Sequence, residues 1–148
     1  MIVFAVTFCL FVISAHGQIP IEKCPDIKGV ENFNGTAYSG DWYELARYPT
    51  FLEDHAECVL SKVEVDADGT LRSNTQMINT DTNERHVLVG EGIPDSTTGE
   101  AKFTLHFVDP DVTIPYWIVG TDYNRYSVGF SCYERDDGVT LVTSCKKK

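Results

Sequence analysis

The chain has little of the positive charge that binds nucleic acids and anionic membranes. Its 148 residues include 12 lysines and arginines against 22 aspartates and glutamates, which gives a net charge of −10 with neutral histidines. A chain with this balance is repelled by nucleic acid and by anionic lipid surfaces. We therefore expect no nucleic-acid partner, and expect the partners to be neutral or cationic.

Sequence motifs of common enzymes and metal sites are also missing. The chain contains no Gly-x-Ser-x-Gly, His-Glu-x-x-His, phosphate loop or Cys-x-x-Cys. His55 near Cys58 could suggest a thiol nucleophile, and His86 with His106 could suggest a metal site. Isolated histidines on strands are more often solvated, so we predict no enzyme, no metal and no required cofactor.

Long apolar runs are absent beyond the first residues. An uncharged run from Ile2 to Ser14 precedes the small-x-small site Ala15-His16-Gly17. This pattern predicts a secretory signal peptide over 1–17 and a single domain over 18–148. Crossing a bilayer takes about 20 apolar residues, so the run is too short for an anchor. We expect a secreted, extracellular protein without a transmembrane segment.

Four cysteines remain once Cys9 is removed with the signal. They are Cys24, Cys58, Cys132 and Cys145. An even count in a secreted chain predicts two disulfides, and spacing alone allows three pairings. Asn34-Gly35-Thr36 is a glycosylation sequon, so we expect Asn34 to be glycosylated.

Convincing helices are lacking, whereas short alternating segments bounded by turn residues recur along the chain. The predicted strands begin at Gly40 and then cover 58–65, 70–78, 85–93, 101–108, 114–120, 126–134 and 139–144. Eight such strands predict an all-β, antiparallel up-and-down barrel. A barrel of this size can hold one small ligand. A β-sandwich is the alternative, which periodicity alone does not exclude.

Two motifs favour the barrel. Gly40-x-Trp42 opens the first strand, and Thr121-Asp122-Tyr123 stands between two late strands. Their order and spacing resemble the two lipocalin signatures, and Pro115 to Tyr123 resembles the branch of apolipoprotein D and the insect bilin-binding proteins. The resemblance covers about residues 22–143 and implies that these five motif residues close one end of the barrel.

The resemblance also implies a pairing and a function. It favours disulfides Cys24–Cys132 and Cys58–Cys145. It implies a carrier of a small hydrophobic ligand, such as a bilin pigment, a sterol-like molecule, a retinoid or a fatty acid. The alternative is a lipocalin that binds a protein through its loops, such as a secreted protease inhibitor.

The expected ligand-binding wall combines alternation with resemblance. Alternation turns Phe103, Leu105 and Phe107 inward. The resemblance adds Phe51 in a flap over the open end, and Asn74, Gln76, Leu88, Tyr116, Ile118, Ser131, Tyr133 and Leu141 on the strands. Apolar walls with a few polar groups are typical of small-molecule pockets. The alternative is that these side chains fill the barrel and leave no cavity.

The chain departs from the family pattern near its end. The family arginine that covers the tryptophan is missing, and Cys145 stands about where it would fall, so Trp42 is expected to lack a cationic partner. The family's long C-terminal helix is missing as well. Its absence would expose an apolar strip, which could lower stability and drive homodimerisation. We expect the closing Lys146-Lys147-Lys148 to be a solvated tail.

Overall fold

A computed structural model describes residues 23–48, 50, 52–135 and 138–148. The predicted signal peptide and the predicted flap residue Phe51 lie outside the described residues. The side chains of 135–142, including Leu141, lie outside them too.

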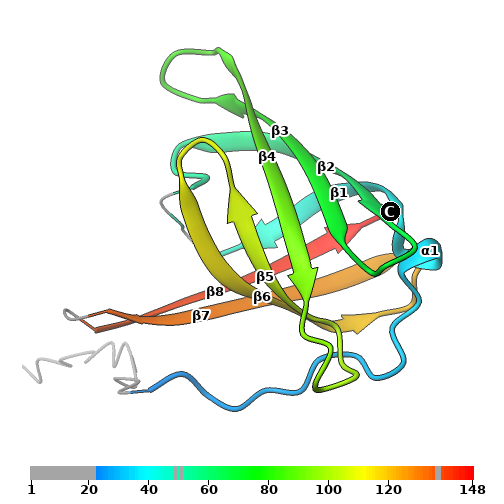
Figure 1. Cartoon of the computed structure of the whole chain (residues 1–148). Coiled ribbons are helices and arrows are strands. Elements are labelled where there is room, and N and C mark those ends of the chain that lie inside the picture. Colours follow the sequence, from blue (N-terminus) through cyan, green and yellow to red (C-terminus); the bar gives the residue numbers. More distant parts are fainter. Residues whose placement is uncertain (1–22, 49, 51, 136–137) are drawn as a thin grey trace, which may run out of the picture.

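Eight antiparallel strands form one closed barrel (Figure 1). Each strand pairs with its neighbours in the sequence, and β1 pairs with β8 to complete the ring. The strands are β1 (Gly40–Arg47), β2 (Ala56–Val65), β3 (Leu71–Asn79), β4 (Arg85–Pro94), β5 (Lys102–Phe107), β6 (Val112–Thr121), β7 (Tyr126–Arg135) and β8 (Gly138–Lys147). The predicted up-and-down barrel is confirmed, and the sandwich is excluded.

Strand alternation and turn chemistry explain this arrangement. In β5, Phe103, Leu105 and Phe107 are buried, while the residues between them are less so. The β2–β3 hairpin turns at Gly69, whose φ of +89° is costly for a residue with a side chain. Such local signals fix the order of the strands, and the buried alternation fixes which face of each strand points inward.

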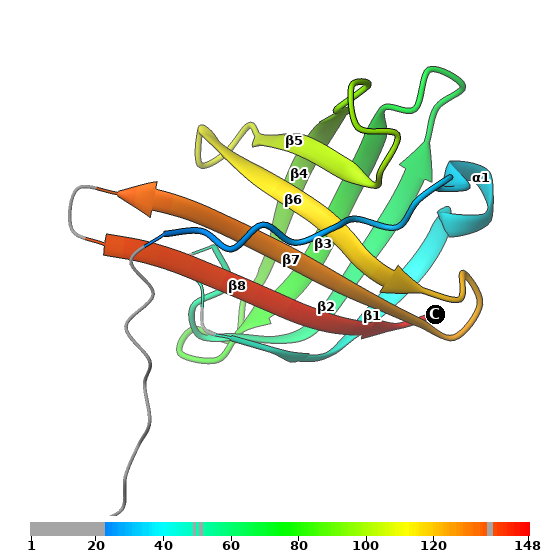
Figure 2. The ribbon, with the colours of Figure 1, turned by 90° about the horizontal axis from the view of Figure 1, so that it is seen from below.

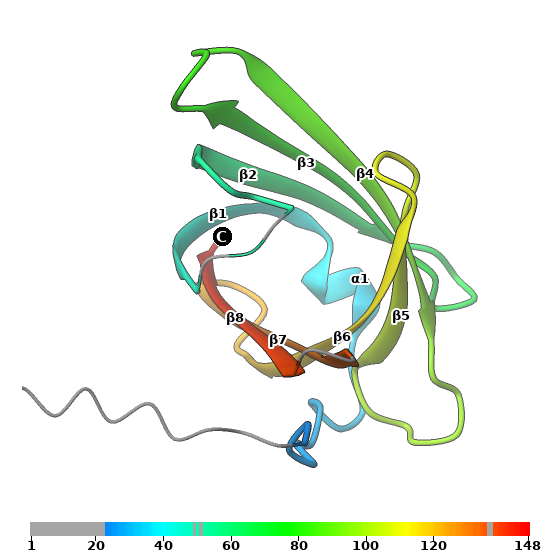
Figure 3. The same ribbon diagram turned by 90° about the vertical axis from the view of Figure 1, so that its left-hand side faces the viewer.

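An aromatic pair closes one end of the barrel. Trp42 is completely buried, and its ring stacks on Tyr38 with the centroids 4.8 Å apart. The indole Nε1 donates a hydrogen bond of 2.8 Å to the Tyr38 carbonyl. Tyr38 ends the four-residue helix α1 (Gly35–Tyr38), which the sequence analysis did not predict and which lies across this end (Figure 3). Gly40 has a φ of +135°, which lets the chain turn from α1 into β1.

The Thr121-Asp122-Tyr123 corner lies beside this floor. The Asp122 carboxylate accepts hydrogen bonds from the backbone N–H groups of Asn124, Arg125 and Tyr126. These bonds, with that from the Arg125 side chain, hold the pKa of Asp122 well below its usual range. Tyr123 packs against the buried cluster that contains Trp42. The corner therefore fixes the β6–β7 turn against the closed end.

The end of the chain corrects two predictions. Lys146 and Lys147 belong to β8 and are not a tail. The Nζ of Lys148 lies 5.4 Å from the centroid of the Trp42 ring, so Trp42 does have a cationic partner. The same ammonium donates to the carbonyls of Ala37 and Tyr123, at 2.8 and 3.0 Å. The prediction was wrong because β8 runs further than its apolar pattern, which ends near Ser144.

An N-terminal arm crosses the outside of the barrel over β7 and β6 (Figure 2). The disulfide Cys24–Cys132 joins it to β7, as predicted. Further along, the Val30 N–H donates to the carbonyl of Ile118 in β6. The arm thus covers the outer face of these strands.

The predicted Cys58–Cys145 disulfide is not formed. Both thiols are free and exposed. Cys58 lies on β2 and Cys145 on β8, and β1 runs between these two strands. Two strand spacings amount to about 9.5 Å, whereas disulfide-bonded residues have Cα atoms within about 7 Å.

Apolar side chains are exposed on the outer face of β1. Tyr43 is 52% and Leu45 is 67% exposed. Homodimerisation through an exposed apolar strip stays a prediction for sedimentation measurements. Within the described residues, no helix is long and apolar enough to cross a membrane.

Candidate functional site

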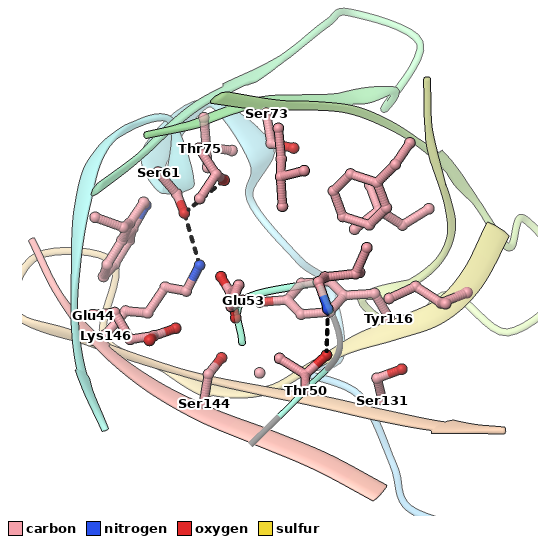
Figure 4. Close-up of a pocket in the computed structure, with 18 of the residues that line it drawn as sticks. Glu44, Thr50, Glu53, Ser61, Ser73, Thr75, Tyr116, Ser131, Ser144 and Lys146 are labelled. Carbon is pink, nitrogen blue, oxygen red and sulfur yellow. Dashed lines mark hydrogen bonds between the residues drawn. The ribbon is translucent and has the colours of Figure 1, made fainter. Parts of the chain in front are cut away.

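A cavity of about 100 Å³ lies inside the barrel, above the aromatic floor (Figure 4). Side chains from β1 to β8 line it, together with Thr50, Leu52 and Glu53 of the flap that follows β1. Its lining includes Trp42, Glu44, Leu52, Glu53, Ser61, Thr75, Leu88, Leu105, Phe107, Ile114, Tyr116, Ser131, Tyr133, Ser144 and Lys146. The barrel is therefore not filled by its own side chains.

The cavity has one apolar part. Leu88, Leu105 and Phe107 form a buried cluster with Val59 and Met77. Leu52 of the flap and Ile114 pack against that cluster. This side of the wall can bury apolar ligand surface, which favours binding at about 25 cal/mol per Å².

Half of the predicted ligand-binding set faces this cavity. Leu88, Leu105, Phe107, Tyr116, Ser131 and Tyr133 all line it. Phe103 and Ile118 point inward but belong to the buried cluster under the cavity, with Trp42 and Tyr38. They support the floor and do not contribute to the lining.

Asn74 and Gln76 correct the predicted wall. They lie on the outer surface of β3, beside Lys62 and Val89. Asn74 is opposite Lys62, whereas its neighbour Thr75 is opposite the buried Ser61. A strand assigned one residue out of register turns every side chain to the wrong face. The inward residues of β3 are Leu71, Ser73, Thr75 and Met77.

A polar belt that the sequence analysis missed lies on the other side of the cavity wall. The Nζ of Lys146 donates to Ser61 Oγ at 2.9 Å, and Ser61 Oγ lies 3.0 Å from Thr75 Oγ1. The alternation of β2 places Ser61 on the face of Val59 and Val63, so that signal was present. No pattern identified Lys146, since it follows the last apolar residues of the strand.

Two acidic side chains extend this belt toward the flap. Glu44 and Glu53 are both largely buried, with side-chain exposures of 5% and 16%. Arg47 binds the Glu44 carboxylate and lies 3.7 Å from that of Glu53. It also donates to the carbonyls of Glu53 and Ala56, which holds the flap against β1. Burial, helped by the nearby charge of Glu44, raises the pKa of Glu53.

Tyr116 is a second polar group beside the flap. Burial, with the nearby charge of Glu53, raises the pKa of its phenol to about 12. A Cβ on Gly129 would lie only 2.4 Å from the Tyr116 Oη, so only glycine leaves room for this ring. On the floor, burial likewise raises the pKa of Tyr38, whose hydroxyl lies 2.8 Å from Ser127 Oγ.

The described residues hold no group of three or more His, Cys, Asp or Glu side chains that could bind a metal. His106 lies on the exposed outer side of β5, where its Nδ1 is 3.1 Å from Thr113 Oγ1. The cavity wall itself offers hydroxyls, carboxylates and one ammonium among apolar side chains. These groups can bind and orient a small organic molecule.

The sequence matches the family model of a lipocalin-like domain over residues 34–142. Apolipoprotein D from Bos taurus is 29% identical over 120 residues, which cover 80% of this chain and 62% of that protein. The Lazarillo protein from Schistocerca americana is 30% identical over 116 residues, which cover 77% of this chain and 54% of the relative. The chain thus spans about three fifths of the length of these curated relatives.

The fold is similar to that of solved lipocalins. Insecticyanin from the tobacco hornworm Manduca sexta superposes with a TM-score of 0.71 at 24% identity, covering 88% of this chain and 70% of the other. That likeness concerns the fold alone, and the family model covers most of the barrel. The closed eight-stranded barrel, the Gly-x-Trp floor and the family match together show that this chain belongs to the lipocalin-like family.

Proposed function

We propose that this protein is an extracellular carrier that holds a small hydrophobic ligand in the barrel cavity. The observation that carries the proposal is the cavity itself, with an apolar wall on one side and a polar belt on the other. Carriage of such ligands is what the lipocalin fold is suited to, because a closed barrel isolates apolar surface from water.

Burial of apolar area supports useful affinity. Covering about 300 Å² of apolar ligand surface contributes about 7 kcal/mol before the costs of association. The polar belt then selects among ligands, because a ligand that breaks the hydrogen bonds between Lys146, Ser61 and Thr75 must replace them. Micromolar binding is consistent with this balance.

The volume of the cavity bears on which ligand fits. At about 100 Å³ it is smaller than the roughly 300–1,000 Å³ of common ligand pockets. A slender chain can enter with small movements of the flap, whereas a bilin would require much larger ones. The volume therefore favours a slender lipid over a pigment.

Mass spectrometry of the protein secreted by its native cells tests the proposal. We expect a copurified small molecule that organic solvent extracts. The variant Ser131→Phe should lose that molecule, because residue 131 lines the cavity. Asn74→Phe is the matched control, since residue 74 lies on the outer surface.

The same variants separate the carrier from a lipocalin that binds a protein through its loops. The carrier proposal would be contradicted if the Ser131→Phe variant lost the copurified molecule but kept the full biological activity of the native protein. A visible absorption band in the purified protein would identify a pigment. Secretion is tested separately. N-terminal sequencing of the mature protein should find Gln18 as its first residue.

A further inference from the structure

Lys146 brings an amino group into the barrel cavity from β8. Its Nζ donates to Ser61 Oγ at 2.9 Å, and this nitrogen makes no other hydrogen bond within the part of the chain that the structure describes. Besides its bond to carbon, a lysine nitrogen has three positions for hydrogen atoms or a lone pair, and Ser61 takes one of them. The other positions are open to a molecule that enters the cavity.

Glu53 lines the same cavity and can exchange a proton with Lys146; both side chains point into it (Figure 4). Burial and the nearby charge of Glu44 raise the pKa of Glu53, and the attraction of the Lys146 ammonium opposes this only in part. Burial disfavours charged groups, so it favours transfer of a proton from the ammonium to the carboxylate. That transfer leaves a neutral amine in the cavity.

The apolar side of the cavity favours an uncharged reactant with a hydrocarbon chain. Leu88, Leu105 and Phe107 form a buried cluster there, and Ile114 packs against it. A slender chain can lie along these side chains while its end reaches Lys146. A neutral lysine amine in an apolar site is a nucleophile, and the reaction typical of it is attack on a carbonyl carbon.

We propose that Lys146 captures a medium-chain aldehyde as a covalent imine, with the chain of the aldehyde against Leu88, Leu105 and Phe107. The proposal rests on the proposed carrier function, because the aldehyde must first enter the cavity. It adds a reaction, a reactive residue and a chemical class of reactant to that function.

The atoms of this reaction balance without a further reactant. Lys146 gives one proton to Glu53, and the lone pair of its nitrogen then attacks the carbonyl carbon while the π electrons move to oxygen. A proton moves from nitrogen to that oxygen, which gives a carbinolamine. Glu53 protonates the hydroxyl group, the carbon–oxygen bond breaks, and water leaves. The iminium returns its proton to the Glu53 carboxylate, so the products are a neutral imine, water and a neutral acid.

Two physical effects distinguish Lys146 from an exposed lysine. Imine formation replaces a charge in the cavity with a neutral group, whereas an exposed ammonium loses favourable hydration when it reacts. The cavity also holds the aldehyde beside the amine, which raises the effective concentration of the two reactants. Lys147 is exposed on the same strand and has neither advantage.

Reductive trapping with octanal tests the proposal. The full-length protein is incubated with octanal and sodium cyanoborohydride, which reduces an imine to a stable secondary amine. Intact-mass measurement counts the octyl groups, and peptide mapping locates them. We expect one octyl group per chain at Lys146, formed at least about tenfold faster than at Lys147. Octanol cannot form an imine, so it should compete with octanal and slow the reaction.

Variants separate the amine from the proton carrier. Lys146→Met should lose the fast adduct, whereas Lys147→Met should keep it. Glu53→Gln should slow formation of the adduct at least about tenfold and leave the affinity for octanol unchanged. Glu57→Gln is the matched control, since this residue is exposed on β2.

Equal rates at Lys146 and Lys147 in the native protein would overturn the proposal, and this comparison decides even if Lys146→Met does not fold. Calorimetric binding of octanol without an adduct at Lys146 would overturn imine formation and leave the carrier proposal standing. An unchanged rate in Glu53→Gln would contradict the proton transfer through Glu53. The carrier proposal fails separately, if the native protein holds no copurified molecule and binds no octanol.

Discussion

Lys148 covers the indole of Trp42, with its ammonium 5.4 Å from the centroid of the ring. In the same position the ammonium binds two carbonyls, of Ala37 in α1 and of Tyr123 in the β6–β7 corner. One side chain therefore joins the last residue of the chain to the floor, the helix and the corner motif. The sequence analysis found no arginine near Cys145 to cover Trp42. Lys148, three residues further on, covers the indole instead.

Removing this ammonium should destabilise the barrel. For Lys148→Ala we expect a loss of about 2 kcal/mol in the free energy of unfolding, from the cation–π contact and the charged hydrogen bonds. Urea unfolding followed by tryptophan fluorescence measures the loss. Lys147→Ala removes the same charge from an exposed neighbour and should change stability by less than about 0.5 kcal/mol. Equal effects of the two variants would show that only net charge matters.

Local sequence patterns predicted the strands, whereas the floor was expected from the resemblance of Gly40-x-Trp42 and Thr121-Asp122-Tyr123 to the lipocalin signatures. Alternation in 101–108 and the turn residues between strands mark elements within a few positions of where they occur. The identity of the inward face of β3 depends instead on pairing with β2. That register places Thr75 opposite Ser61 and turns Asn74 outward, and no residue within β3 reveals it.

The same reasoning explains why the polar belt was missed. Lys146 enters the cavity only because β8 continues to Lys147 and pairs with β1. A run of lysines at the end of a chain is typical of a solvated tail, so its pattern predicts the opposite. Long-range pairing across the closing seam of the barrel decides the position of this side chain.

Gly129 should be essential for the shape of the cavity. In Gly129→Ala the new Cβ would lie 2.4 Å from Tyr116 Oη, so the ring must move or the strands must separate. We expect a loss of about 1–3 kcal/mol in stability, as for other overpacked sites, together with weaker ligand binding. Gly120→Ala is the control, because its nearest atom would be 3.9 Å away. An unchanged unfolding curve for Gly129→Ala would contradict the close approach.

Stability should fall at alkaline pH through Tyr116. Its folded-state pKa of about 12 exceeds the ordinary value of 10.0, so the folded state holds the phenol proton more tightly. This contribution is complete below pH 10 and is lost as the pH rises toward 12. Urea midpoints measured across this range should fall less steeply in Tyr116→Phe. Tyr43→Phe, on the exposed face of β1, should keep the slope of the native protein.

The cysteines should differ in both reactivity and energetic role. Cys58 and Cys145 are exposed free thiols, so an aromatic disulfide reagent should label two thiols in the folded, unreduced protein. Cys58→Ser and Cys145→Ser should each remove one labelled thiol and change stability by less than about 0.5 kcal/mol.

Cys24 and Cys132 close a loop with a sequence separation of 108, and replacing both with serine should cost about 4 kcal/mol of the free energy of unfolding. If the native protein showed no reactive thiol and Cys58→Ser created one at Cys145, these two residues would be joined in solution. The barrel would then need β2 and β8 to approach each other across β1.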